Sequence, residues 1–514
     1  MLYNMSRREM NGRALRLFRY LACALVCAAL VGVGGAGASS ESTAAVRAST
    51  PAQWKPWHLT SADQLRLKAP PAARSAQTKA ELAQLRRLQR TRGPAQVAAF
   101  QKWNGQGAAI AWTKVAIDML RSYRPRPPLA ARFLAIFQTG LYDAMIAADD
   151  SRIAYARSRP APAKLDKRLK PLAKTPASTY APYEAAMAGA AERLLHSLFP
   201  GEPQRTFTAF ANEAVGSRLS AGVNYRSDVQ NARALGQKVA DAVIARAKAD
   251  NSTSTRLPNP TLSGEGYWAS TPPLYEPFIG GPVGTWKTWL LSSPGVARTI
   301  LPGPSAYGSP EFMRQLRQVL DVSRSLTGEQ RQIANFWDDG PGTDTPAGHW
   351  HSVAIELIRS YRLAGPKAVR ALAYLSTVEA DAVIACWEAK FYWWSVRPIT
   401  AIWRLSADGT KLNKESDCQA NPSLCPQRNV WYSIISTPGF PSYPSGHSSF
   451  SGGAGKILTY FFPKAGETLN LLANQAAASR LYGGMHFDED NRDGLVLGRS
   501  IADLAIARAK ADPG

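Results

Sequence analysis

One stretch of the chain, from Ser376 to Val396, contains neither proline nor glycine and is rich in alanine and other helix formers. Such a run predicts a long helix, because nothing in it interrupts the ladder of backbone hydrogen bonds. The alternation of apolar and polar residues that marks strands is nearly absent elsewhere. We therefore expect an all-α protein. The predicted helices span 129–149, 181–198, 203–220, 227–249, 310–325, 328–338, 350–362, 366–396, 445–462 and 471–482.

Two of these predicted helices contain similar short sequences. Asp-Ala-Met-Ile-Ala begins at Asp143, and Asp-Ala-Val-Ile-Ala begins at Asp381. Repetition of this kind indicates two related helical bundles. Asp381 itself lies about 180° round its helix from Lys390, so we expect it to have a packing or arginine-pairing role.

Lys390 belongs to a stripe of four residues on the long helix. Trp387, Lys390, Trp394 and Arg397 recur at intervals of three and four, which places them on one face. Pro398 is expected to end the helix there. A lone lysine and arginine usually mark a solvated basic face, but the two indoles favour burial, and buried cations need an anionic partner.

A second polar segment, Pro-Ser-Gly-His, precedes an apolar run of small residues. This run, Ser445 to Phe462, predicts a helix whose first amides point outward and favour an anion. Ser445 and the amide of Gly446 could donate hydrogen bonds to such an anion, and His447 could act above it. Alternatively, Ser445 is only an N-cap and His447 only a first-turn residue.

The third segment contains Arg480 and His486. Leu471 to Tyr482 predicts an alanine-rich helix, and a continued helix would place these two side chains about 240° apart. Gly483 and Gly484 would end the helix and let the chain turn back, so that His486 could reach the same centre as Arg480. The alternative is a surface-loop histidine beside the acidic run that follows it.

Together the three segments supply cations, a hydroxyl, an open amide and imidazoles, which suit a buried tetrahedral oxyanion. Their order and spacing, Lys-x6-Arg-Pro, Pro-Ser-Gly-His and Ser-Arg-x5-His, resemble the signature that vanadium-dependent haloperoxidases share with the type 2 phosphatidic acid phosphatase superfamily. The resemblance implies two packed four-helix bundles. It also implies that vanadate is held by Lys390, Arg397, Ser445, Gly446, Arg480 and His486.

The resemblance further assigns roles within the site. His486 would be the axial vanadium ligand, His447 would be the acid or base, and Lys390 would polarise the peroxide. Trp387 and Phe440 match aromatic positions that lie near the halide in fungal chloroperoxidases of this family, although both could be ordinary core residues. The implied reaction is oxidation of halide by hydrogen peroxide, giving hypohalous acid or a halogenated small organic acceptor.

Vanadate and phosphate are nearly isosteric, so the same residues permit a second chemistry. In an acid phosphatase, His486 would be the phosphorylated nucleophile, His447 would protonate the leaving group, and no cofactor would be needed. A third alternative is a non-catalytic oxyanion-binding protein. His349 and His351, with Asp338 and Asp339, could suggest a separate metal site, but residues at i and i+2 of a helix do not face each other. We expect that segment to cap a helix and line the mouth of the site.

The N-terminus predicts an export signal over residues 1–38, because several arginines precede the uncharged core Leu21–Val33 and small residues follow it. The mature protein would be periplasmic or extracellular, and no later segment is apolar enough to span a membrane. Residues 39–100 are expected to form a Pro- and Ala-rich basic leader, ordered packing to start near Trp103, and residues 101–514 to form one helical catalytic domain.

The formal net charge of +23 does not by itself indicate nucleic-acid binding, since the basic run lacks interleaved aromatics or a recognised module. Positive charge would instead draw anionic substrates. Cys418 and Cys425 could form a disulfide in an oxidising compartment, and Cys386 is expected to be a buried free thiol. The segments 251–308 and 405–443 are expected to cover the mouth of the site.

Overall fold

The computed structural model describes residues 50–160, 168–173, 178–257, 259–271, 275–405 and 431–512, and these contain helices but no named strand. The first half contains α2 (Ala76–Arg90), α3 (Pro94–Trp103), α4 (Gln106–Tyr123), α5 (Pro127–Tyr155), α6 (Tyr183–Leu198), α7 (Gln204–Ser220) and α8 (Arg226–Lys248). The second half contains α9 (Ala297–Ile300), α10 (Pro310–Arg324), α11 (Gly328–Phe336), α12 (Thr345–Ser360), α13 (Gly365–Trp393), α14 (Pro398–Leu405), α16 (Gly446–Phe461), α17 (Gly466–Tyr482) and α18 (Asp488–Ala511).

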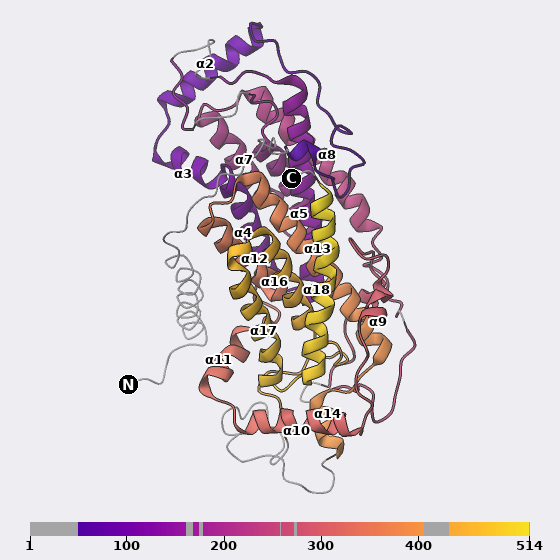
Figure 1. Ribbon diagram of the computed structural model, residues 1–514. Helices are drawn as coiled ribbons and strands as arrows, with labels where there is room; N and C mark the ends of the chain where they lie inside the picture. The colour runs from indigo at the N-terminus through magenta and orange to yellow at the C-terminus, as the bar shows by residue number, and fades with distance from the viewer. Residues whose placement is uncertain are drawn as a thin grey trace, which may run out of the picture.

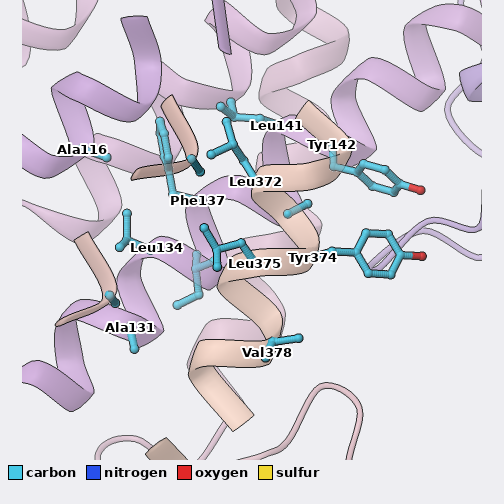
Figure 2. Packing of buried hydrophobic residues seen from close by; sticks show 14 of the residues in the cluster. Ala116, Ala131, Leu134, Phe137, Leu141, Tyr142, Leu372, Tyr374, Leu375 and Val378 are labelled. Atoms are coloured by element: carbon cyan, nitrogen blue, oxygen red, sulfur yellow. The ribbon is translucent and has the colours of Figure 1, made fainter. Parts of the chain in front are cut away.

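The helices form two bundles, which confirms the predicted all-α fold. The N-terminal bundle contains α5, α6, α7 and α8, and the second bundle contains α13, α16, α17 and α18 (Figure 1). Corresponding helices have equal or nearly equal lengths: α5 and α13 have 29 residues each, α6 and α16 have 16, α7 and α17 have 17, and α8 and α18 have 23 and 24. The two long helices pack on each other through buried leucine, phenylalanine and tyrosine side chains (Figure 2).

Asp143 and Asp381 perform the same task in the two bundles. The Asp143 carboxylate accepts hydrogen bonds from three successive amides, those of residues 57–59, at 2.7–3.2 Å. The Asp381 carboxylate accepts from the amides of residues 289–291 at 2.7–2.9 Å. Burial raises the pKa of each carboxyl to about 6, although the hydrogen bonds from these amides lower the pKa. Asp381 therefore holds a loop backbone on the bundle, rather than pairing with arginine as one of its predicted roles required.

Each of the two loops is also contacted by an arginine, and the two arginines have corresponding contacts. Arg246 of α8 lies over the Trp289 ring, with its carbon 3.4 Å from the ring centroid, and Arg508 of α18 lies over Trp57 at 4.0 Å. Each guanidinium also donates to two loop carbonyls just before that tryptophan. The two bundles are therefore internal repeats, as the paired sequences predicted.

Three local predictions need correction. The long helix ends at Trp393, because Trp394 adopts a left-handed conformation with φ of 51°, so Arg397 follows the helix instead of continuing its stripe. Pro398 begins α14 rather than ending α13. The acidic run after His486 is the first turn of α18, a helix that the sequence pattern did not predict, and α4 was also missed.

Ordered packing was expected to start near Trp103, but in the structure it starts well before that residue. Trp54 is buried in the main core and stacks on Tyr142, while Leu82 and Leu85 of α2 are buried in a smaller cluster. No helix in the described part of the chain is long and apolar enough to cross a bilayer. The predicted export signal and the Cys418–Cys425 pair lie outside the described residues.

Candidate oxyanion site

The end of α13 and the linker after it supply two buried cations. Lys390 is fully buried and its ammonium donates to the carbonyls of Pro441 and Ser442 at 3.0 and 2.7 Å, which leaves one of its three hydrogens for another acceptor. Arg397 is also fully buried and donates through Nε to Phe440 O and through Nη1 to Met485 O. Its Nη2 has no partner among the described residues.

The N-terminus of α16 supplies the second segment. Ser445 is the N-cap, and its hydroxyl accepts from the amide of Ser448, as the simpler alternative predicted. Its own amide donates to the carbonyl of Asp490 at 2.8 Å, which joins this turn to α18. His447 is half-buried and bonds to the backbone of Asp338, while its Nε2 has no partner among the described residues.

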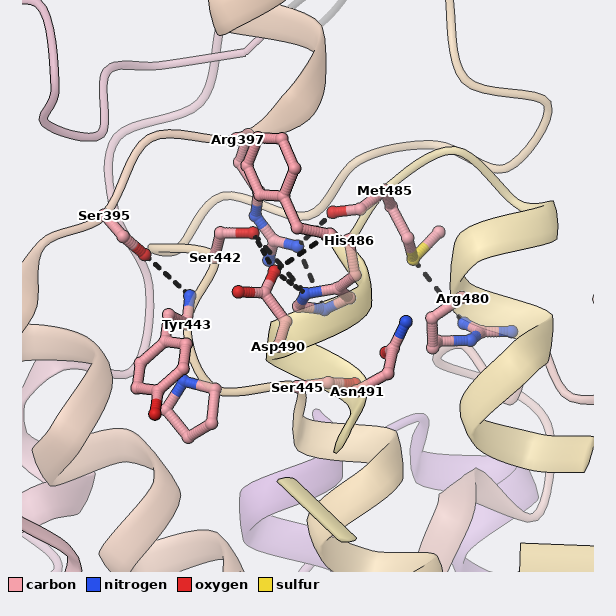
Figure 3. Close-up of polar contacts among 12 residues, drawn as sticks. Ser395, Arg397, Ser442, Tyr443, Ser445, Arg480, Met485, His486, Asp490 and Asn491 are labelled. Carbon is pink, nitrogen blue, oxygen red and sulfur yellow. Dashed lines mark hydrogen bonds and ion pairs between the residues drawn. The ribbon is translucent and has the colours of Figure 1, made fainter. Parts of the chain in front are cut away.

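The third segment turns back as predicted. α17 ends at Tyr482, Gly484 has a φ of 77°, and α18 begins at Asp488. His486 therefore returns to the site, where Arg397 Nη1 donates to its Nε2 at 3.1 Å (Figure 3). Arg480 is buried and donates to the carbonyl of Trp337 at 2.6 Å. The structure thus brings the three separated segments together around His486.

Asp490 is the residue that the sequence reasoning missed. It is buried, and His486 Nδ1 donates to its Oδ2 at 2.8 Å (Figure 3). The same oxygen accepts from the hydroxyl of Ser442 and the amide of Phe487. Donation from Nδ1 fixes the imidazole tautomer and leaves the Nε2 lone pair for a ligand or an electrophile. An acid four residues after the histidine, in the first turn of a helix, was the available signal.

The electrostatics of the site favour an anion. Burial lowers the pKa of Lys390 to about 7, of Arg397 to about 9 and of Arg480 to about 10. Among the described residues, none of these three cations forms an ion pair with a carboxylate; their partners are carbonyls, an imidazole, a hydroxyl and a thioether. Burial and neighbouring arginines lower the pKa of both His447 and His486, so both imidazoles are neutral at pH 7.

Aromatic side chains cover one side of these cations. The rings of Trp387 and Phe440 are 5.0 Å apart, and the Lys390 ammonium lies 5.8 and 5.1 Å from their centroids. A side chain at Gly446 would have a Cβ only 3.2 Å from the Trp387 ring, so only glycine fits there without displacement. Trp387 and Phe440 therefore lie beside the site, which is where the resemblance requires them.

The two nearby histidines have different partners. His349 Nδ1 lies 3.1 Å from both oxygens of Asp339, and its ring stacks on Trp337. His351 is fully buried, and its Nδ1 lies 2.8 Å from Ala347 O and 3.2 Å from Glu379. These rings have no protein partner in common. Cys386 is a buried free thiol, as predicted, with a pKa that burial raises.

Sequence comparison relates the second bundle to a known family. Residues 370–467 and 464–512 match a family model described as the VCPO second helical-bundle domain, and these residues include all three segments of the site. No curated protein matches the sequence.

Solved structures extend the likeness to both bundles. A bacterial vanadium-dependent iodoperoxidase is 24% identical, with a TM-score of 0.61 over 79% of this chain and 96% of that chain. The apo form of a bacterial vanadium-dependent chloroperoxidase is 14% identical, with a TM-score of 0.53 over 75% of this chain and 94% of that chain. Its holo form is 14% identical, with a TM-score of 0.50 over 77% and 93%. The second bundle therefore matches the VCPO helical-bundle domain in sequence, and the two bundles share the fold of these bacterial vanadium-dependent haloperoxidases.

Proposed function

We propose that the protein is a vanadate-dependent haloperoxidase, which uses hydrogen peroxide to oxidise a halide to hypohalous acid. One observation carries the proposal. Lys390, Arg397 and Arg480 are buried together, and among the described residues they have no carboxylate partner, while the neutral Nε2 of His486 lies among them. Buried cations without a counter-charge are costly, so the site suits a multiply charged anion that also accepts a nitrogen ligand.

The residues present fit vanadate. The free Nη2 of Arg397 and the spare hydrogen of Lys390 are donors for its oxygens, and the open position of Gly446 leaves room for close approach. His486 would replace its contact with Arg397 by a bond to the metal. Vanadate, when bound, supplies a Lewis acid that activates peroxide without a change in oxidation state.

Side chains of the protein would carry out the remaining steps. The Nε2 of His447 is neutral and without a partner among the described residues, so it can accept a proton from hydrogen peroxide. Lys390 then donates a hydrogen bond to the peroxide oxygen that the halide attacks. The apolar wall of Trp387 and Phe440 strips water from the halide and makes it a better nucleophile.

A cavity of about 800 Å³ provides space for an organic acceptor. It borders the site at Asp490, and its lining combines aromatic side chains, including Tyr307, Tyr392 and Trp393, with proline, glycine and polar residues. Such a volume and lining suit a small aromatic molecule. The predicted covering segment 251–308 contributes much of this lining.

The test compares two activities of the purified protein, each with and without added vanadate. Oxidation of bromide or iodide that requires vanadate and peroxide, and that phosphate suppresses, would support the proposal. Hydrolysis of an aryl phosphate without vanadate would instead select the phosphatase alternative. Tight vanadate binding without either activity would leave an oxyanion-binding protein.

Replacing Asp490 by asparagine should weaken vanadate binding by about 10- to 100-fold, the usual effect of removing a carboxylate that orients a histidine ligand. The neutral amide no longer stabilises Nδ1–H, so the His486 tautomer and ring orientation are less fixed. Equilibrium dialysis measures the affinity. Asp493→Asn is the matched control, because Asp493 is also buried on α18 but accepts from the Tyr443 hydroxyl. Equal affinities in both variants would contradict the role of Asp490.

Vanadate affinity should fall as the pH rises above about 7. Burial lowers the pKa of Lys390 to about 7, so in the empty site its charge is present below that pH and lost above it.

Lys390→Arg keeps the cation at every pH, so the ratio of its affinity to that of the wild type should rise by up to about tenfold per pH unit above 7. Because both proteins are measured at the same pH, the effect of vanadate's own ionisation on the affinity cancels in this ratio. Lys456→Arg, an exposed lysine paired with Asp503, should keep the wild-type profile. A constant ratio for Lys390→Arg between pH 6 and 9 would refute the prediction.

A further inference from the structure

The N-terminal bundle repeats the layout of the oxyanion site at its α7–α8 turn. Ser217-Arg218 ends α7 as Ser479-Arg480 ends α17, and the residues after each pair keep the same intervals. Position by position, Arg218 corresponds to Arg480, Asn224 to His486 and Asp228 to Asp490.

The starts of α6 and α16 also correspond. Their N-caps are Pro182 and Ser445, so Glu184 stands where His447 stands. The close contacts of α6 with α8 and of α16 with α18 support this register. A Cβ on Gly236 would meet Ala186 O at 1.8 Å, and one on Gly498 would meet Ser449 O at 2.1 Å.

The hydrogen bonds around the buried aspartates are the same in both bundles. Asp228 Oδ2 accepts from the hydroxyl of Thr179 and from the amide of Tyr225, at 3.0 and 3.3 Å. Asp490 Oδ2 accepts from the corresponding groups of Ser442 and Phe487. The N-terminal bundle thus keeps the scaffold of the site as well as its sequence intervals.

The two copies differ in how their cations are neutralised. Arg218 forms an ion pair with Glu184 at 2.9 Å, and both side chains are only 7% exposed. Arg157 forms ion pairs with Asp228 and Glu81 in the same region. In the second bundle the corresponding cation, Arg480, forms no ion pair with a carboxylate among the described residues; His447 lies near it, and the carboxylates of Asp338 and Asp339 act on it only from beyond ion-pair distance. The N-terminal copy therefore has its arginine paired with an internal carboxylate, whereas the second copy has no such ion pair among the described residues.

We infer that the N-terminal bundle contains a second copy of the oxyanion site, closed by the Glu184 carboxylate, and that removing this carboxylate opens the copy to a tetrahedral oxyanion such as phosphate. The Glu184 carboxylate neutralises Arg218 as a bound oxyanion would. Asn224 in place of a histidine removes the nitrogen ligand, so the opened copy binds an anion without haloperoxidase chemistry. The inference depends on the internal repeat and not on the proposed activity.

The test counts bound phosphate by equilibrium dialysis. Glu184→Ala removes the carboxylate and leaves space beside Arg218, so it should bind one more phosphate per chain than the wild type. The double variant Glu184→Ala/Arg218→Met should lose this extra phosphate. Glu192→Ala is the matched control, because Glu192 is also buried on α6 and pairs with an arginine, Arg233, outside the repeated layout. It should bind as the wild type does.

An unchanged count in folded Glu184→Ala would overturn the inference, whatever the second bundle binds, since that site is the same in both proteins. If the variant is unfolded in phosphate-free buffer, phosphate should refold it and restore its helical circular dichroism. A chain that stays unfolded with phosphate would also overturn the inference. Vanadate-dependent activity of the wild type is a separate measurement, so a failure there does not affect this outcome.

Discussion

Replacing His486 by alanine is expected to weaken vanadate binding by more than about 100-fold, beyond the range for residues that only support a ligand. The Nε2 of His486 is neutral at pH 7 because burial lowers its pKa, and Asp490 holds Nδ1 as the protonated nitrogen. This Nε2 already accepts a hydrogen bond from the buried Arg397 at 3.1 Å, so its lone pair points at the cations of the site. Equilibrium dialysis should show the loss, and halide oxidation should fall with it.

Two further histidine variants separate binding from chemistry. His447→Ala should retain vanadate but lose turnover, because the Nε2 of His447 acts on the proton of peroxide in the proposed mechanism. His196→Ala, on α6 against Phe207, should change neither. Full vanadate binding by His486→Ala would contradict the prediction, because it would show that the arginines hold the anion without this histidine.

Replacing Asp381 by alanine should lower the free energy of unfolding by about 3–4 kcal/mol, because it leaves three buried or half-buried amides at 289–291 without their acceptor. Asp143→Ala should have a similar effect, since Asp143 holds the loop 57–59 in the same way. Urea unfolding followed by circular dichroism gives these values.

The control for both variants is Asp241→Ala. Asp241 is 56% exposed in its surface pair with Arg193, so its loss should cost no more than about 0.5 kcal/mol. A change below about 1 kcal/mol in both Asp143→Ala and Asp381→Ala would show that water replaces the carboxylate at the loop amides.

The three segments of the site could be found from the sequence because each contains residues that predict its local backbone conformation. The two glycines after Tyr482 predicted the turn that returns His486, and the structure has that turn. Asp490 could not be assigned the same way, because an acidic run has many uses and the helix that contains it, α18, shows no clear apolar stripe at its start. Only its hydrogen bond with His486 in the structure distinguishes it from the neighbouring Asp488 and Glu489.

The errors have a common physical origin, which is tertiary packing that overrides local preference. The run from Ser376 contains no helix breaker, yet Trp394 turns left-handed; its carbonyl accepts from the Trp268 amide of a distant segment at 2.6 Å. The N-terminal segment is rich in proline and charge, yet Trp54 is buried because Arg370 and Tyr142 provide a surface for its ring. Neither contact is encoded by residues near it in the chain.

The packing of α5 on α13 joins two repeats through the same face of each. That arrangement is the one expected of a symmetric homodimer whose subunits have become covalently linked. In a homodimer every substitution occurs in both subunits. Once the two halves are joined in one chain, each half can change independently. Under the proposed function, the half with the buried histidine would carry the chemistry, and the half with the buried glutamate, whose charges are paired internally, would support it.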